Sequence, residues 1–289
     1  MNSDILFGMK NKIAYCGIEG AFANIAAKKI FPLDQLISYP TFTSAYKAVE
    51  NGECDFAVLP MENSFAGDVS QVFDLMFTGT LFISQIFKFK IAQTLLGIKG
   101  AKIDDIKTVY SHQQAIDQCC EFIQKNGFVP LPAVNTAVAA KEVAQKNDKT
   151  IAAIASEEAG ILYGLEILAK NINQTSQNTT RFAVFSKQTQ TDFLEDDKVV
   201  SYLMFAVKNV PGALSAAIKI ISKKGFNLIS LHSHPIKDVA WEYYFYAEVE
   251  GSLFGKKGQK LIEKLKKGCS LVKIAGQTSE KQEEKQGGV

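Results

Sequence analysis

Short apolar runs alternate with longer amphipathic segments from residue 12 to about residue 187. The short runs have the length of strands and several end at Gly or Pro, whereas the segments between them repeat apolar residues at helical spacing. Strands are predicted at 13–17, 55–60, 108–110, 128–131 and 151–155. Helices are predicted at 21–31, 114–125, 137–146 and 157–163. This alternation predicts an α/β fold with several parallel crossovers.

The pattern changes after a polar, acidic stretch at 188–198, which we expect to be a linker between two domains. Beyond it the predicted order is strand, helix, strand, strand, helix, strand, at 199–207, 212–224, 226–231, 241–249, 257–267 and 271–275. This βαββαβ order is the ferredoxin-like arrangement. The last segment, 276–289, is polar enough to be predicted as a disordered tail. The domains are therefore expected at 12–187 and 199–275.

Composition narrows the class of protein. The 289 residues are 47% hydrophobic, which excludes wholesale disorder. The formal net charge is +2 and the basic residues are scattered, which argues against nucleic acid as a partner. Five cysteines without a CxxC pair indicate neither a disulfide framework nor a zinc site. Without a signal-peptide pattern or an apolar run of the roughly 18 residues that a membrane span needs, we expect a cytoplasmic protein.

Two polar stretches follow predicted strands and are candidates for ligand binding. The turn GIEGAFA at 17–23 could bring backbone N–H groups to a small anion, although its glycine spacing matches neither a dinucleotide nor a Walker fingerprint. In LPMENSFAGDV, at 59–69, Glu62, Asn63 and Ser64 stand where ligands bind in open α/β folds. Alternatively, Asn63 or Ser64 caps the helix that follows.

A third stretch, QNTTRFAVF at 177–185, passes abruptly from polar to apolar residues. A guanidinium is a planar fork that suits a carboxylate, and a Thr hydroxyl can donate one hydrogen bond, so Thr180 and Arg181 could hold an anion and reach its leaving group. The alternative is a surface Arg at the start of a strand. His112 could be a base or a helix cap, but it has no Ser, Cys or ligand pattern with it, so neither a triad nor a metal site is predicted.

These stretches occur in an order that resembles the prephenate dehydratase family. The motifs that carry the resemblance are a GPxGTFS-like turn at 17–23, ENSxxG at 62–67, SHxQAxxQC at 111–119, an STAxAA-like segment at 135–140, AAIAS at 152–156 and NxTRF at 178–182. The unit after the linker resembles an ACT regulatory domain, with PGAL at 211–214. The resemblance extends from about residue 12 to residue 275.

The resemblance implies a catalytic part of two α/β lobes, like a periplasmic binding protein, with the substrate between them. It implies conversion of prephenate to phenylpyruvate, with loss of water and CO2 and with no cofactor. The catalytic residue is then Thr180, expected to donate a hydrogen bond to the departing hydroxyl. Arg181 is expected to face a substrate carboxylate. The remaining expected substrate-binding residues are Asn63, Ser64, Glu62, Gly20, Ala21 and Phe182. Among them Glu62 is expected to orient the loop, because it would repel a dianion.

The ACT resemblance implies feedback regulation by phenylalanine through a homodimer or homotetramer. The residues expected at the regulatory site are Pro211, Gly212, Ala213, Leu214, His232, Ser233, His234 and Pro235. The last four read HSHP, so two histidines replace the Glu and Arg of the family's ESRP motif. An imidazole titrates near neutral pH, so an altered affinity or pH response is expected.

Two alternative functions stay open. An arogenate dehydratase would use the same fold and the same Thr on a substrate with an amino group in place of the keto group, and no residue here decides between them. A non-catalytic amino-acid sensor would keep the binding cleft and the ACT domain. The first turn departs from the family, because Ile18 replaces Pro and Ala21 and Ala23 replace hydroxyl residues. Elsewhere Gln93 stands where the family often has His.

Overall fold

The protein is described by a computed structural model that covers residues 10–279 except 176, 190, 192, 194–197 and 238. The described residues divide into two units. One holds residues 10–58, 63–67 and the described part of 89–180, and the other holds 59–62, 68–88 and the described part of 181–279. The chain changes unit inside two strands, β3 (Phe56–Asn63) and β11 (Thr179–Ser186).

The first unit begins with parallel strands joined by helices. β1 (Lys12–Cys16) pairs in parallel with β2 (Gln35–Tyr39) and with the start of β3. The connecting helices are α1 (Phe22–Ile30) and α2 (Phe42–Glu50). The pattern predicted β1, α1 and β3 but not β2 or α2. β2 ends the sheet and is only partly buried, so its sequence lacks a strong apolar signal.

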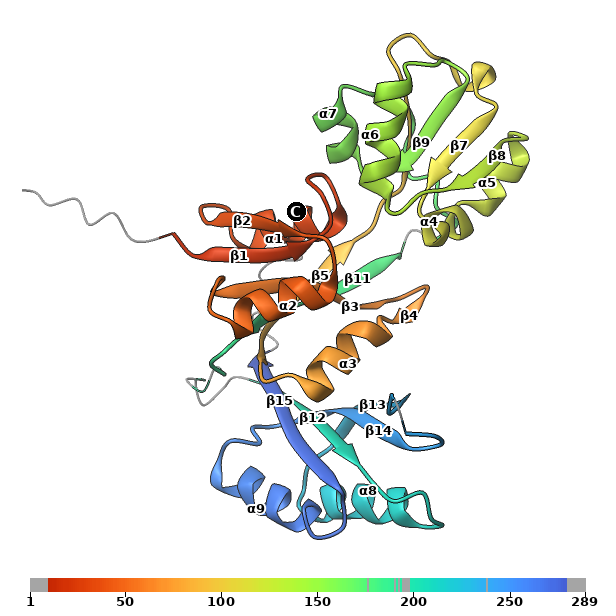
Figure 1. Cartoon of the computed structure of the whole chain (residues 1–289). Coiled ribbons are helices and arrows are strands. Elements are labelled where there is room, and N and C mark those ends of the chain that lie inside the picture. The colour runs from red at the N-terminus through yellow and green to blue at the C-terminus, as the bar shows by residue number, and fades with distance from the viewer. Residues whose placement is uncertain are drawn as a thin grey trace, which may run out of the picture. The chain divides into compact units, whose positions relative to one another are not determined.

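A second, five-stranded sheet completes the first unit, with order β10-β6-β9-β7-β8. Its strands are β6 (Thr94–Gly97), β7 (Thr108–Ser111), β8 (Val129–Pro132), β9 (Ile151–Ala155) and β10 (Glu166–Ala169). The short η1 (Ile103–Asp105) and the helices α4 (Gln113–Gln118), α5 (Cys120–Lys125), α6 (Thr136–Lys146) and α7 (Glu157–Tyr163) accompany them. β7 runs parallel to β8 and β9, whereas β6 is antiparallel to β9 and β10. The predicted α/β class with parallel crossovers is therefore confirmed (Figure 1).

The second unit contains the ferredoxin-like arrangement. Its order is β12 (Val199–Ala206), α8 (Ala213–Lys223), β13 (Leu228–Pro235), β14 (Tyr243–Glu250), α9 (Lys256–Leu265) and β15 (Leu271–Ser279). This confirms the predicted βαββαβ order. In the sheet, β13-β14-β12-β15 continues into β5 (Phe82–Lys90) and β11. The unit also holds α3 (Ser70–Thr78), and the short β4 (Gly67–Asp68) pairs with β3.

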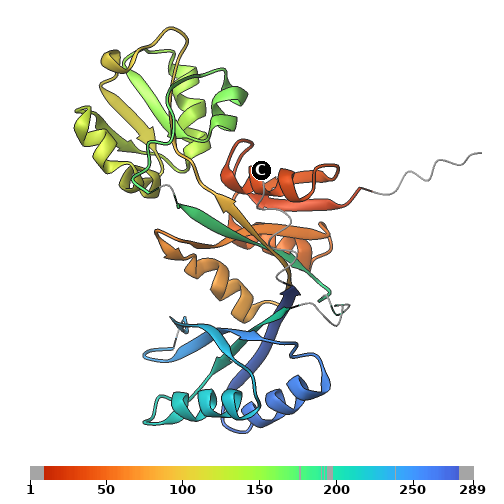
Figure 2. The ribbon, with the colours of Figure 1, turned by 180° about the vertical axis from the view of Figure 1, so that it is seen from behind.

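β12 and β14 of the ferredoxin-like sheet are buried on both faces. Leu203 and Ala247 belong to a core that α8 and α9 cover from one side. On the other side α3 packs against the sheet, where Phe73 lies edge-on to Tyr246 and Phe77 stacks on Tyr244. Figures 1 and 2 show these helices on opposite faces of the sheet. Alternate residues of β14 therefore face two different apolar layers, which explains its long run of buried side chains.

The predicted boundary between the last strand and the tail needs correction. β15 does not end at residue 275 but continues to Ser279, because the residues that follow pair with β12 despite their polar side chains. Thr278, for example, is fully buried and bonds to Tyr202. At Gly276, paired with Ile83, a Cβ would lie 2.2 Å from the Ile83 carbonyl oxygen. The tail predicted at 276–289 thus cannot begin before residue 280, beyond which it lies outside the described residues.

The predicted linker at 188–198 lies partly outside the described residues. Within the part of the chain that the structure describes, no helix has both the length and the apolar character that crossing a membrane requires.

Candidate functional site

The hydroxyl of Thr180 is held by the side chain that ends β3. Thr180 is the second residue of β11 and is only 7% exposed. Asn63 Nδ2 donates to Thr180 Oγ1 at 2.9 Å and to Asn178 Oδ1 at 2.9 Å. Because the Thr180 oxygen accepts the bond from Asn63, its own hydrogen can be donated to another group. These two side chains, predicted from separate motifs, therefore meet.

The carboxamide of Asn63 is fixed by its own loop. Its Oδ1 accepts from the backbone N–H groups of Phe65 and Ala66, each at 3.0 Å, which leaves Nδ2 aimed at Thr180. Neither Asn63 nor Ser64 caps the following helix, which begins only at Ser70. An asparagine that bonds to amides two and three residues ahead forms a local turn instead.

Ser64 fastens the same loop to the segment before β11. Its Oγ donates to the carbonyl of Gln177 at 3.2 Å and accepts from the N–H of Thr179 at 3.0 Å. Its own N–H donates to the Thr179 carbonyl at 2.9 Å. Ser64 therefore bonds to the backbone of the residues on either side of Asn178, and this places Asn178 and Thr180 beside Asn63.

Three further buried carboxamides extend the site, and sequence reasoning assigned them no role. Asn178 Nδ2 donates to Gln118 Oε1 at 2.9 Å, and Gln93 Nε2 donates to the same oxygen at 3.3 Å. All three side chains are at most 2% exposed, and Gln93 Oε1 has no partner among the described residues. Asn178 and Gln118 do stand inside the NxTRF and SHxQAxxQC motifs. Their place in these motifs was the signal available from the sequence. The hydrogen bonds themselves follow from burial, because buried amides need partners.

Arg181 contacts two carboxylates of the protein itself. Its Nη1 donates to Glu62 Oε2 at 3.0 Å and to Glu248 Oε1 at 2.8 Å, and a contact with a substrate carboxylate stays a prediction. Successive side chains of a strand point to opposite faces, so Arg181 faces away from the group that Thr180 faces. Burial opposes its charge, but the carboxylate of Glu248 outweighs this and raises the pKa of Arg181 above its ordinary value.

The remaining expected substrate-binding residues serve the protein itself. The N–H of Gly20 donates to Asn24 Oδ1 at 3.1 Å and that of Ala21 donates to the carbonyl of Ile18 at 3.1 Å, so these amides are used inside the turn. The carbonyl of Gly20 accepts from Ser156 Oγ at 3.4 Å. Phe182 is 1% exposed and lies in the interior. The expected contact of Gly20, Ala21 and Phe182 with the substrate stays a prediction.

The HSHP residues lie in β13 and not in a loop, and they contact the segment after the ENS motif. His232 Nδ1 lies 2.7 Å from Asp68 Oδ2, and His234 Nε2 lies 3.3 Å from the same oxygen. His234 is buried and stacks on Phe73 at 4.6 Å, whereas Ser233 and Pro235 are exposed. Successive side chains of a strand point to opposite faces, so His232 and His234 face Asp68 whereas Ser233 and Pro235 face the other side of the sheet.

The PGAL turn opens α8. Pro211 and Gly212 are exposed, and Gly212 has a φ of 85°, a left-handed conformation that suits glycine. Ala213 is the first residue of the helix, and Leu214 packs on the core shared with α9. The turn thus keeps the small residues and open backbone that the resemblance led us to expect.

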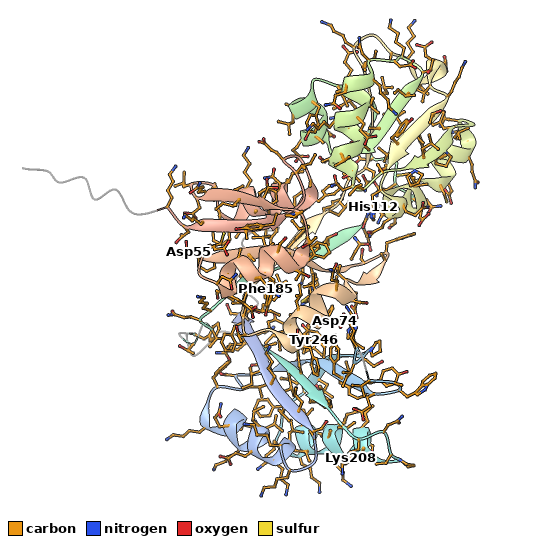
Figure 3. The ribbon with its side chains drawn as sticks, viewed as in Figure 1. Asp55, Asp74, His112, Phe185, Lys208 and Tyr246 are labelled. Carbon is orange, nitrogen blue, oxygen red and sulfur yellow. The ribbon has the colours of Figure 1, made fainter. Side chains whose placement is uncertain are left out.

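His112, labelled in Figure 3, immediately precedes α4, and its Nδ1 accepts from the N–H of Gln114 at 3.3 Å. This contact is that of a helix-capping side chain. Within the described ranges no group of three or more His, Cys, Asp or Glu side chains could hold a metal ion.

Comparisons with known proteins give the same assignment along the chain. A family model described as prephenate dehydratase matches residues 13–190, and one described as ACT domain matches residues 201–267. A curated relative, arogenate dehydratase/prephenate dehydratase 1, chloroplastic, of Arabidopsis thaliana, is 32% identical over 281 residues. That match covers 92% of this chain and 71% of the relative.

Two solved structures share the fold. The prephenate dehydratase of Arthrobacter aurescens in complex with L-Phe has a TM-score of 0.84 and 23% identity, covering 92% of this chain and 89% of that one. GqqA, described as a novel type of quorum quenching acylase, has a TM-score of 0.82 and 30% identity, covering 92% of this chain and 97% of that one.

Proposed function

Because the chain belongs to the prephenate dehydratase family, we propose that it converts prephenate to phenylpyruvate, with loss of water and CO2. The observation that carries the mechanism is the contact between Asn63 and Thr180. Prephenate is a dianion whose ring hydroxyl leaves as CO2 is lost, and aromatisation of the ring drives the reaction. The enzyme therefore has to hold the substrate and stabilise the departing oxygen.

Thr180 is the proposed donor to that oxygen. A Thr hydroxyl is a weak acid in water, so its role is a positioned hydrogen bond rather than transfer of a bulk proton. The bond that Thr180 accepts from Asn63 fixes the hydroxyl and polarises it, which makes it a better donor. Burial of Thr180 adds to this, because a hydrogen bond is electrostatically stronger where water is excluded.

Arogenate is a second candidate substrate, because the relative from Arabidopsis carries both activities in its name. The two substrates share the ring, the leaving hydroxyl and the carboxylate that is lost, so the donor at Thr180 serves either. They differ in a keto or an amino group on the side chain. Turnover of each by the purified protein distinguishes them.

An acylase reaction is a further candidate, because GqqA is similar to this chain. Hydrolysis of an amide through a Thr nucleophile requires a base that takes the hydroxyl proton. Asn63 instead donates to Thr180 Oγ1, and an amide NH2 group cannot take that proton. The geometry therefore favours a hydrogen-bond donor over a nucleophile.

The test is replacement of Thr180 by Ala and by Ser. Thr180→Ala is expected to lower kcat on prephenate by about 100-fold to 10,000-fold, the usual worth of such a donor, whereas Thr180→Ser keeps the hydroxyl and much of the rate. The measurements are formation of phenylpyruvate from prephenate, of phenylalanine from arogenate and of free acid from an N-acyl amine. Near wild-type turnover of prephenate by Thr180→Ala contradicts the assignment.

We further propose that phenylalanine regulates the enzyme through the ACT domain, in a cytoplasmic homodimer or homotetramer. The match to an ACT domain at residues 201–267 supports this, as does the open turn at Gly212. The histidines of HSHP make this regulation different in affinity from that of a domain with ESRP.

A further inference from the structure

An ion-paired cluster links the ACT domain to the strands that carry the catalytic pair. Arg181 Nη1 lies 3.0 Å from Glu62 Oε2 and 2.8 Å from Glu248 Oε1. Glu248 belongs to β14 of the ACT domain. Glu62 immediately precedes Asn63 in β3, and Arg181 immediately follows Thr180 in β11. Each of the two catalytic side chains therefore has a chain neighbour in the cluster.

The ACT side of the cluster is rigidly built. Glu248 is 6% exposed, and Tyr246 donates to Glu248 Oε1 at 3.0 Å. Tyr246, labelled in Figure 3, is itself 1% exposed. Its ring stacks on Tyr202 and lies edge-on to Phe73 of α3. A buried carboxylate is stable only when it is paired and hydrogen-bonded. Glu248 is thus paired with Arg181 and hydrogen-bonded to Tyr246, which makes it a fixed anchor for the guanidinium.

We propose that Glu248 is a positioning residue for the dehydratase: it holds Arg181 and, through Arg181, Glu62, and so places Thr180 and Asn63. The inference rests on the proposed function. Arg181 also joins β11 to Glu62 of β3, so loss of its anchor removes a contact that holds these two strands together next to Thr180 and Asn63. A displacement of about 1 Å at a catalytic group can lower the rate by about 100-fold.

The other end of the ENS loop is also held by the ACT domain. Asp68 contacts His232 at 2.7 Å and His234 at 3.3 Å, both from β13. The segment from Glu62 to Asp68, which contains Asn63, is therefore joined to the ACT sheet directly at Asp68 and, through Arg181, at Glu62. Any rearrangement of that sheet reaches the loop through these contacts.

The first experiment compares Glu248→Gln with the wild-type enzyme. Glutamine keeps the shape and an acceptor oxygen for Tyr246 and Arg181 but loses the charge. We expect kcat on prephenate to fall by about 10-fold to 100-fold, with KM near the wild-type value, because positioning and not substrate affinity is lost. Glu250→Gln is the matched control: it removes the same charge from an exposed position of the same strand and is expected to leave the kinetics unchanged.

The second experiment asks whether Glu248 acts through Arg181. If it does, Glu248→Gln combined with Arg181→Lys is no slower than the slower single variant, whereas independent effects would multiply. Hydrogen exchange gives a readout that needs no turnover: the amides of Ser64, Phe65 and Ala66 should exchange faster in Glu248→Gln than in Glu250→Gln. Unchanged kcat, unchanged exchange or multiplied losses would each overturn the inference. A wild-type enzyme inactive on prephenate would instead contradict the proposed function, and the exchange data would still decide the role of Glu248.

Discussion

At the scale of single residues, the site depends on one carboxamide that does two things. Asn63 Oδ1 accepts two backbone amides and so fixes its loop, while Nδ2 donates to Thr180. The orientation of the amide is therefore determined by the loop and not chosen freely. The two roles can be tested separately with a residue of the same shape that accepts hydrogen bonds but cannot donate them.

Asn63→Asp makes this separation. The carboxylate still accepts from the loop amides, so the fold is expected to persist. It cannot donate to Thr180 and instead accepts a hydrogen bond from the Thr180 hydroxyl. Repulsion of a dianionic substrate adds to the loss. We expect kcat/KM on prephenate to fall by about 100-fold or more. The melting temperature is expected to fall as well, because the buried carboxylate faces the Asn178 Oδ1 to which the Asn63 amide donated. Steady-state kinetics with thermal unfolding check this, and a variant that keeps wild-type turnover contradicts the role of the Asn63 donor.

At the scale of elements, β13 is joined to the loop after β3 through Asp68. Burial works against the charge of Asp68, but its contacts with His234 and His232 prevail and hold the pKa of this carboxyl below its ordinary value of 3.8. A lowered folded-state pKa stabilises the fold fully above the ordinary value, and this contribution disappears as the pH falls through the folded-state pKa.

Asp68→Asn is therefore expected to lower the melting temperature at pH 5 and above, and the gap from the wild-type protein is expected to close as the pH falls below 3.8. Thermal unfolding across this pH range is the measurement. Asp104→Asn, at an exposed position of η1, is the control and should show no such closing gap. A gap that is independent of pH would mean that the charge of Asp68 contributes nothing.

At the scale of the whole molecule, the ACT sheet and part of the catalytic fold form one hydrogen-bonded structure. β15 pairs with β5, and β11 lies next in the strand order. α3 covers the face of the ACT sheet that its own helices leave open. The strand that carries Thr180 therefore belongs to the sheet that the ACT domain extends.

Addition of phenylalanine is expected to change both the sedimentation coefficient and the rate of phenylpyruvate formation. The apparent affinity for prephenate is expected to change by about 5-fold to 150-fold. Gly212→Val is the matched variant, because a branched side chain is strained at a φ of 85° and would distort the turn without touching the catalytic residues. It should keep the basal rate and lose the response. If phenylalanine altered neither quantity in the wild-type protein, regulation through the ACT domain would be wrong.

The order of elements could be predicted from the sequence. Apolar periodicity is a local property, so β1, α1, β9 and the βαββαβ unit were predicted, and the resemblance carried by the ENS and NxTRF motifs pointed to Asn63 and Thr180. The sequence could not predict β2, whose half-exposed residues carry a weak signal, or the extension of β15, whose polar residues are buried by long-range pairing.

The groups that these residues contact became known only from the folded structure. Arg181 was expected to face a substrate carboxylate because a guanidinium suits one, yet its protein partners lie 119 and 67 residues away in the chain, on strands that pairing alone brings beside it. Because successive side chains of a strand point to opposite faces, Thr180 faces Asn63 and Arg181 faces Glu248 of the ACT domain. The pattern of residue types along the chain indicates secondary-structure propensity and burial. The partner of a buried charge depends instead on strand register, which is fixed when distant strands pair.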